Sequence, residues 1–320
     1  MKKIFVIVCI LFLTNKAISQ ELNLPVFSQY LADNPFVVSP TFAGIGDNLR
    51  IRANGLTQWV GIKNAPQNTS LYGDMRLGNR SGVGITLYSD KNGFTRQNGV
   101  KFSFAQHIML DEYSKQFLSF GISYNINNFR IETGDFTPSI LDPIVTTDRY
   151  ISNNNFDLGF LYRLGGFYTS FNANNILAKP IKNFRGIEPA LLLNYQVYSG
   201  YVFRSDNRVE WEPSAYFQYF QSDKRSTTDL NLKVRKFDSQ DNYYWAGLSA
   251  RFLNDQSFKP TQIGPMVGLK KANFYFGYSY LATLNELSGF NSGTHVITLG
   301  LDFFQGISNC PCTQYLGREQ

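Results

Sequence analysis

The sequence has 320 residues, of which 16% are aromatic and only 17% are charged. A soluble protein would bury so many aromatic side chains in a core and would usually carry more surface charge, so this composition argues against an ordinary soluble globular protein. The formal net charge is +6, but three of the lysines (Lys2, Lys3 and Lys16) lie in the first 19 residues, so their removal lowers the charge to +3. We therefore expect no nucleic-acid partner.

Residues 1–19 have the parts of a secretory signal peptide. Two lysines precede the apolar stretch Ile4–Leu13, and Ala17-Ile18-Ser19 forms a small-x-small cleavage site. The apolar stretch is too short to span a membrane, and no later stretch is long enough for a spanning helix. Cys9 lies inside the apolar stretch rather than at the cleavage point, which argues against a lipoprotein. We expect an exported protein of the bacterial outer membrane with both mature termini in the periplasm.

Residues 20–47 are predicted to be irregular. They contain two proline breaks, Asn34-Pro35 and Ser39-Pro40, followed by Ala43-Gly44, and proline removes a backbone donor and biases the preceding residue away from helix. A barrel of about fourteen strands encloses space that side chains alone do not fill. We therefore predict that this segment folds into the lumen as a plug. A disordered periplasmic lead is the alternative, against which the apolar content of the segment argues.

Residues 48–304 contain many short stretches in which apolar and polar residues alternate, as in Val83, Ile85 and Leu87. This period of two is typical of strands, and its repetition without a spanning helix predicts an all-β fold, a transmembrane antiparallel β-barrel. The predicted strands are 48–59, 69–79, 80–90, 97–108, 115–127, 154–164, 165–174, 189–203, 207–221, 226–237, 242–254, 260–271, 272–282 and 294–304. About fourteen strands meets the even number that bacterial barrels require.

The predicted connections alternate in length. Long ones are expected at 60–68, 91–96, 128–153, 175–188 and 283–293, and tight ones at 78–80, 164–166 and 270–273. With both termini in the periplasm, the long connections face outward, as is the rule for outer-membrane barrels. The connections at 222–225 and 255–259 fit least well, because they are no longer than their periplasmic neighbours.

Strand periodicity also predicts which side chains face lipid. The lipid-facing candidates are Leu49, Ile51, Val100, Phe102, Phe104, Leu230, Leu232, Val234, Tyr244, Leu248, Phe252, Phe274, Phe276 and Tyr278. The opposite face carries Arg50, Arg52, Asp74, Arg76, Lys101, Glu210, Glu212, Lys233, Arg235 and Arg251. A charge on the lipid face costs roughly 2 to 4 kcal/mol near the bilayer midplane, so a membrane barrel would enforce this sorting. A soluble β-sandwich is the alternative, but it does not account for the signal, the aromatic content and the alternating connections together.

A set of motif residues lies in the amino-terminal part of the mature chain: Phe27, Gln29, Tyr30, Asn34, Pro35, Ser39, Pro40, Ala43, Gly44, Gln58, Trp59, Gly61, Ala65 and Pro66. Together they resemble the amino-terminal signature of the PorP/SprF family of type IX secretion system membrane proteins. The resemblance extends through Ser89-Asp90-Lys91-Asn92-Gly93 to the last strand. Ser39 is a departure, since the family more often has Asn before this Pro.

The resemblance implies a non-enzymatic outer-membrane barrel that supports secretion and surface attachment of a specific protein, such as a large gliding adhesin with a type-B carboxy-terminal domain. It also implies contacts with other type IX components, including periplasmic ring lipoproteins. The sequence does not separate these two roles. Loops carry recognition while a barrel supplies rigidity, so we expect the connections 128–153 and 175–188 to dock the partner.

Little in the sequence indicates catalysis, a cofactor or a metal. His107 lies on the inward face of its strand without a recognisable nucleophile or acid, and His295 is expected at the outer rim. Asp90 and Asn92 before Gly93 resemble the start of a calcium loop, but the later bidentate acid is missing. A plain turn is the prediction there.

The tail 305–320 follows the terminal aromatics Phe303 and Phe304 and is expected in the periplasm. It carries Cys310 and Cys312, which could pair with each other, bond to a partner in an oxidising compartment, or remain incidental exposed thiols.

The inward basic residues suggest a second function, an outer-membrane porin or FadL-like transporter with a basic lumen. The residues concerned are Arg50, Arg52, Arg76, Lys101, Lys233, Arg235 and Arg251, and rings of basic side chains favour anions in pores. The competing expectation is that they pair with Asp74, Glu210, Glu212 and plug carbonyls and so close the pore.

Overall fold

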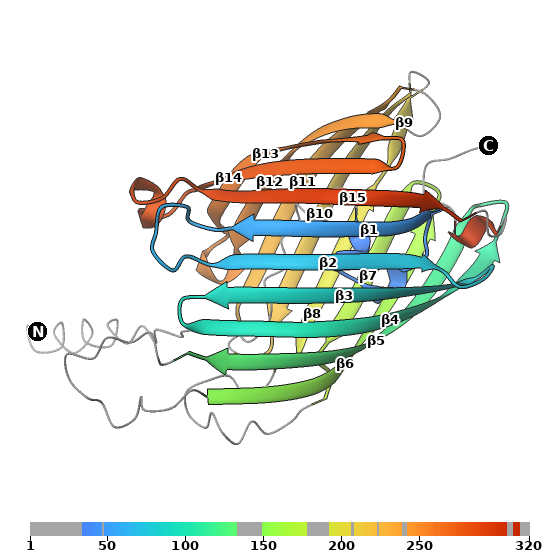
Figure 1. The fold of residues 1–320 in the computed structure, drawn as a ribbon. Helices are drawn as coiled ribbons and strands as arrows, with labels where there is room; N and C mark the ends of the chain where they lie inside the picture. The colour runs from blue at the N-terminus through green and yellow to red at the C-terminus, as the bar shows by residue number, and fades with distance from the viewer. Residues whose placement is uncertain are drawn as a thin grey trace, which may run out of the picture.

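The computed structural model describes residues 34–46, 48–132, 149–177, 192–205, 208–222, 224–238, 242–305 and 310–313. These residues form one closed antiparallel β-barrel (Figure 1). Its strands are β1 (Asn48–Thr57), β2 (Gln67–Arg76), β3 (Ser81–Asn92), β4 (Thr95–Asp111), β5 (Gln116–Ile131), β6 (Arg149–Leu164), β7 (Phe167–Asn174), β8 (Asn194–Tyr201), β9 (Phe203–Ser205), β10 (Val209–Phe220), β11 (Ser226–Phe237), β12 (Tyr243–Leu253), β13 (Lys259–Lys271), β14 (Phe274–Thr283) and β15 (Thr294–Phe304). Short 3-10 helices are η2 (Pro35–Val37), η3 (Pro40–Phe42), η6 (Asn254–Gln256), η7 (Glu286–Gly289) and η8 (Pro311–Thr313).

The sheet closes because the last strand pairs with the first and β10 pairs with β11. β1 pairs with β15 from Asn48↔Phe304 to Thr57↔His295, and β10 pairs with β11. β8 and β9 both pair with β10 and are separated only by Val202, so they form one interrupted strand. Counting them as one gives fourteen barrel strands, and the predicted fold class is confirmed. Across the described ranges, no helix is long and apolar enough to cross a membrane.

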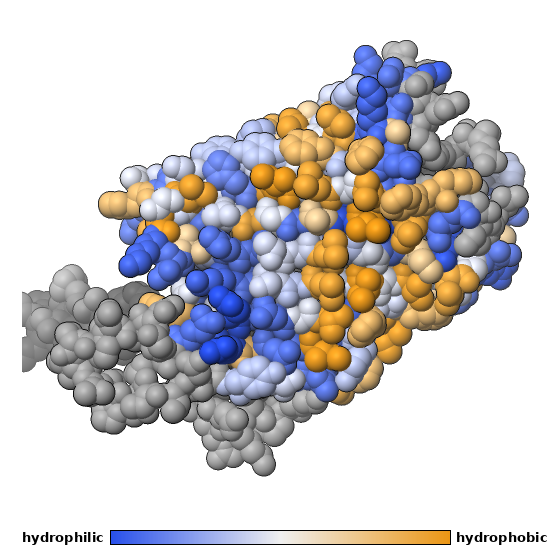
Figure 2. Space-filling view, viewed as in Figure 1, coloured by the Kyte–Doolittle hydropathy of each residue, from blue (hydrophilic) through white to orange (hydrophobic). Residues whose placement is uncertain are grey.

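Side chains alternate between the two faces of the barrel wall. Leu248 and Phe274 point outward and are 59% and 68% exposed, whereas Arg52 and Arg76 point inward and are 2% and 1% exposed. Figure 2 shows the apolar side chains gathered in a band across the strands, with hydrophilic residues toward both ends of the barrel. The outward face is therefore matched to lipid, and the inward face is polar yet closely packed.

The two ends of the barrel differ in their connections. One end, the short-turn end, carries the tight connections 77–80, 112–115, 165–166, 206–208, 238–242 and 272–273. The other, the long-connection end, carries 58–66, 132–148, 175–193, 221–225, 254–258 and 284–293.

The predicted long connection at 91–96 is wrong. β3 ends at Asn92 and β4 begins at Thr95, which pair with each other, so only Gly93 and Phe94 remain in the turn. Gly93 has φ +61, a conformation that glycine adopts without steric cost. β4 has 17 residues, more than the 9–11 or so that span a bilayer. The polar residues in 91–96 are typical of a loop, but here they belong to strands that continue beyond the lipid, where polar residues are allowed.

Candidate functional site

The barrel interior is occupied by residues 34–46, which we call the inner segment (Figure 1). Its prolines stop any regular helix, so it forms only two short turns: Pro35 begins η2 and Pro40 begins η3. Ser39 caps the second turn by accepting a hydrogen bond from the Thr41 amide at 3.2 Å. Phe36 and Phe42 are 3% and 4% exposed. This part of the predicted plug is therefore packed inside the barrel, whereas residues 20–33 and Asp47 lie outside the described residues.

Inward-facing glycines form the seat of the inner segment. A β-carbon on Gly82 would lie 2.1 Å from the Ala43 carbonyl oxygen, and one on Gly121 would lie 2.6 Å from the Thr41 amide nitrogen. A β-carbon on Gly84 would lie 2.3 Å from the Phe36 ring. Real β-carbons do not approach other atoms so closely, so these three wall positions accommodate the inner segment because they are glycines.

Polar groups of the wall bind the backbone of the inner segment. Asp74 Oδ2 accepts from the Gly44 amide at 3.0 Å and from Arg50 Nη2 at 2.6 Å. His107 Nε2 lies 3.0 Å from the Ala43 carbonyl oxygen, and its Nδ1 lies 2.8 Å from Ser119 Oγ. Because a carbonyl only accepts, His107 donates through Nε2, and its neutral Nδ1 accepts from Ser119.

These hydrogen bonds give His107 a structural role. Both ring nitrogens are used, and His107 and Ser119 are each 0% exposed. A Ser–His pair that acts on a substrate needs an accessible hydroxyl and an orienting acid. Here the ring is oriented by a carbonyl of the inner segment instead. His295, at the long-connection end, contacts Tyr278 Oη through Nδ1 at 2.8 Å.

The described part of the tail, residues 310–313, lies against the inner segment at the short-turn end. The Thr313 carbonyl accepts from the Gly46 amide at 2.7 Å and from Arg76 Nη2 at 2.8 Å, and the Cys312 carbonyl accepts from Arg163. Cys310 and Cys312 are joined by a disulfide, and Cys312 is 0% exposed. The remainder of the tail, 306–309 and 314–320, lies outside the described residues. Residues 310–313 are thus part of the packed interior.

The predicted lumen-lining basic residues all have partners. Ion pairs join Arg50 to Asp74 (2.6 Å), Arg52 to Asp302 (2.5 Å), Lys101 to Asp157 (2.6 Å), Lys233 to Glu212 (2.7 Å), Arg235 to Glu210 (3.0 Å) and Arg251 to Asp229 (2.6 Å). Arg76 donates to the carbonyls of Gly44 and Thr313. Several pairs follow directly from strand register, since Glu210 is opposite Arg235 and Glu212 is opposite Lys233. Six of the seven predicted basic residues are therefore paired with carboxylates, and the seventh, Arg76, is bound to carbonyls.

The second half of the motif lies elsewhere, in the β1–β2 connection. The Gln58 amide donates to the Pro66 carbonyl at 2.9 Å, while Val60 exchanges hydrogen bonds with the connection 284–293, through Gly293 O at 3.0 Å and the Ser292 amide at 2.8 Å. Trp59 and Gly61 have φ 51 and 105. The sequence motif thus has two locations, the inner segment and a rim at the long-connection end. Phe27, Gln29 and Tyr30 lie outside the described residues.

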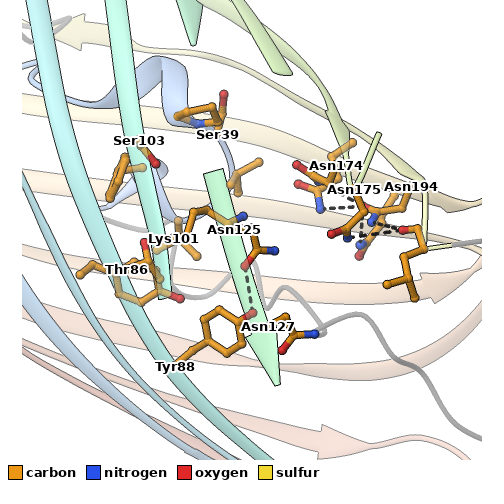
Figure 3. A pocket seen from close by; sticks show the side chains of 18 of the residues that line it. Ser39, Thr86, Tyr88, Lys101, Ser103, Asn125, Asn127, Asn174, Asn175 and Asn194 are labelled. Carbon is orange, nitrogen blue, oxygen red and sulfur yellow. Dashed lines mark hydrogen bonds between the residues drawn. The ribbon is translucent and has the colours of Figure 1, made fainter. Parts of the chain in front are cut away.

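Between the inner segment and the long-connection end lies a polar chamber of about 100 Å³ (Figure 3). Its amide side chains are Asn68, Gln97, Asn125, Asn127, Asn174, Asn175, Asn194, Gln196 and Gln218. The lining also includes Phe36–Pro40 of the inner segment, Tyr72, Thr86, Tyr88, Lys101, Ser103 and Leu192. The sequence analysis missed this site. The available signal was the recurrence of Asn and Gln at inward positions near the long-connection ends of the strands.

The remaining observations concern metal binding and the Asp90 side chain. Among the described residues, no group of three or more His, Cys, Asp or Glu side chains is placed to hold a metal ion. Asp90 accepts a hydrogen bond from Asn68 Nδ2 at 3.2 Å beside the β3–β4 turn.

Comparison with known proteins identifies both sequence and structural relatives. The family model described as "Type IX secretion system membrane protein PorP/SprF" matches residues 19–301. No curated protein matches this chain in sequence. Among solved structures, the chain is similar to the CymD monoaromatic hydrocarbon channel, at TM-score 0.53 and 10% identity over 89% of this chain and 95% of that one. CdiB from Acinetobacter baumannii gives TM-score 0.39 and 8% identity over 80% and 60%, and outer membrane phospholipase A from Escherichia coli gives 0.36 and 10% over 85% and 93%. At such identities the likeness to the channel concerns the fold alone, and that fold is an outer-membrane barrel.

Proposed function

This chain belongs to the PorP/SprF family of type IX secretion system membrane proteins, and we propose that it is a non-enzymatic barrel that supports the secretion and surface attachment of one partner protein. The partner is a large adhesin carrying a type-B carboxy-terminal domain. The barrel resides in the outer membrane, and the adhesin docks at its long-connection end. The short turns and both mature termini face the periplasm, where they meet other secretion components, including ring lipoproteins.

An ordered rim at the long-connection end carries this proposal. The motif-bearing connection 58–66 is hydrogen-bonded to the connection 284–293, which bears Phe290, a side chain that is 77% exposed. Phe290 lies in the connection between β14 and β15 and not within a strand. An exposed aromatic side chain on a fixed connection is suited to anchoring a protein partner.

The filled interior supports attachment over transport. The inner segment, residues 310–313 and several ion pairs, including Arg52–Asp302, occupy the short-turn half, so solute passage would require these contacts to break. A porin or FadL-like transporter is the competing function, and the likeness to a hydrocarbon channel concerns the fold only. The complete burial of His107 and Ser119 supports a non-enzymatic role, because a substrate does not reach them.

The test is adhesin retention in cells. Because β5 ends at Ile131 and β6 begins at Arg149, residues 133–148 can be replaced by a short Gly-Ser linker without cutting either strand. We expect the barrel to assemble and the adhesin to be released into the medium. A second variant, Phe290→Ser, should weaken co-purification of the adhesin from detergent-solubilised outer membranes.

Tyr113→Ser provides the matched control, since Tyr113 is 99% exposed on a turn at the opposite end. This control should leave both retention and co-purification unchanged. Normal retention by the linker variant, together with normal co-purification by Phe290→Ser, would refute docking at the long-connection end.

A further inference from the structure

The amide-lined chamber has chemistry that the attachment function does not use. Two of its lining oxygens, Asn127 Oδ1 and Gln196 Oε1, are buried without a hydrogen-bond partner. Asn127 is 7% exposed and Gln196 is 4% exposed. Buried polar groups are normally satisfied, and leaving one without a partner is costly. The chamber therefore presents acceptors that a bound molecule with hydroxyl donors would satisfy.

Neighbouring amides orient these acceptors. Asn194 Oδ1 accepts from Asn174 Nδ2 at 3.1 Å and from Gln196 Nε2 at 3.1 Å. Because the nitrogen of Gln196 is committed to Asn194, its oxygen is left for the chamber. Asn125 Oδ1 is likewise fixed by accepting from Tyr88 Oη at 3.2 Å. Figure 3 shows Asn125, Asn174 and Asn194 among the side chains that line this one pocket.

The chamber selects against charge. Lys101 is the charged residue in its lining, and its Nζ lies 2.6 Å from Asp157 Oδ2. An ionic ligand would have to compete with this pair or enter without a counter-charge, which is expensive away from water. A neutral ligand avoids both costs.

The lining also contains aromatic rings, together with aliphatic and hydroxyl side chains. The rings of Tyr72, Tyr88 and Phe36 lie among the amides. A sugar ring combines an apolar C–H face with hydroxyls that both donate and accept, which complements rings alternating with amides. We propose that this chamber binds a neutral, hydroxyl-rich ligand of one or two sugar units.

Size and position favour this ligand over an extended peptide. About 100 Å³ is closer to one sugar ring than to a chain carrying side chains. Phe36–Pro40 floor the chamber, so the ligand binds there and does not pass through. The proposal does not depend on the adhesin function, because sugar binding and adhesin retention are measured separately.

The test uses the purified full-length protein in detergent, with maltose, cellobiose and N-acetylglucosamine as neutral probes and glucuronate as a charged one. Isothermal titration and saturation-transfer NMR should show saturable millimolar binding of at least one neutral sugar and no binding of glucuronate. Asn127→Leu and Gln196→Leu should each weaken that binding about tenfold or more, since each removes an acceptor. Asn128→Leu, the same change on the next residue and on the outer face, should leave it unchanged.

Unmodified protein provides a readout that does not depend on variant folding, because a bound sugar should raise its unfolding temperature. The absence of saturable binding by every neutral probe would overturn the proposal. So would equal weakening by Asn128→Leu, or displacement of the sugar by an uncharged extended peptide that binds more tightly through the same two residues.

Discussion

The two halves of the barrel interior are built from different chemistry. The short-turn half is filled by the inner segment, by residues 310–313 and by ion pairs such as Arg52–Asp302 and Arg235–Glu210. The half nearer the long connections also holds ion pairs, Arg251–Asp229 among them, but it contains a chamber lined mainly by uncharged amides, two of whose oxygens have no partner. Removing one member of a buried ion pair leaves an uncompensated charge, whereas a buried neutral amide can be satisfied by a ligand or by water. On this comparison, the ion pairs and the inner segment hold the barrel closed, and the chamber amides are available to bind a ligand.

The largest effect is expected from removing Asp302, the carboxylate that two buried cations share in the short-turn half. Asp302 accepts from both Arg52 (2.5 Å) and Lys270 (3.1 Å), and the three side chains are at most 6% exposed. Asp302→Ala leaves two buried cations and should lower the free energy of unfolding by about 3–5 kcal/mol. Guanidinium unfolding of the protein in micelles measures this.

Glu132→Ala is the matched control in the other half, because Glu132 pairs at 3.5 Å with an Arg96 side chain that is 43% exposed. It should cost only about 0–1 kcal/mol. Equal losses of unfolding free energy in the two variants would show that the buried ion pairs of the short-turn half do not stabilise the barrel.

The next effect concerns the seat of the inner segment. Gly121→Val places a side chain where the Thr41 amide nitrogen is 2.6 Å from even a β-carbon, and overpacking of this kind costs about 1–3 kcal/mol. We expect the inner segment to leave its seat and become cleavable by protease in otherwise folded barrels. Gly73→Val adds the same side chain on the outer face of β2, where the nearest atom to a β-carbon is 3.7 Å away. Protection of the segment in both variants would argue against the glycine seat.

A smaller effect is expected from the tail. Ending the chain after Gln305 removes the Thr313 carbonyl that accepts from Gly46 and Arg76. The inner segment should lose about 1–2 kcal/mol of local stability, seen as faster hydrogen exchange of the Gly46 amide. Exchange at an unchanged rate would mean that residues 310–313 do not secure the segment.

The smallest effect is predicted in the chamber. Asn127→Leu removes an oxygen that has no partner, so stability should change by less than about 1 kcal/mol. Asn155→Leu is the contrasting variant, because Asn155 Oδ1 accepts from the Phe156 and Leu177 amides at 2.9 and 2.8 Å. That change should cost more, and thermal unfolding compares the two. A large loss for Asn127→Leu would indicate that the chamber is structural.

The strands and their faces could be predicted because a period of two is a local property of the sequence. The β3–β4 hairpin was misjudged because Asp90, Lys91 and Asn92 are polar, although strands that extend past lipid can be polar on both faces. The interruption at Val202 had no local signal.

The interior was harder to predict because it depends on which strands become neighbours. Asp302 and Arg52 are separated by nearly the whole chain and meet only when β15 closes on β1. Gly82 and Gly121 are ordinary strand glycines until the inner segment lies against them. The chamber amides come from β2, β4, β5, β7, β8 and β10 and from Asn175 just after β7, over a long stretch of sequence, so no spacing in the sequence reveals them. Composition indicated a polar lumen but not where its amide side chains would gather into a chamber.

Ion conductance of the purified full-length protein in planar lipid bilayers tests the central claim most directly. A barrel closed by its inner segment and paired charges should carry no steady current. A persistent anion-selective current through the unmodified protein would contradict this account and favour a pore lined by basic residues.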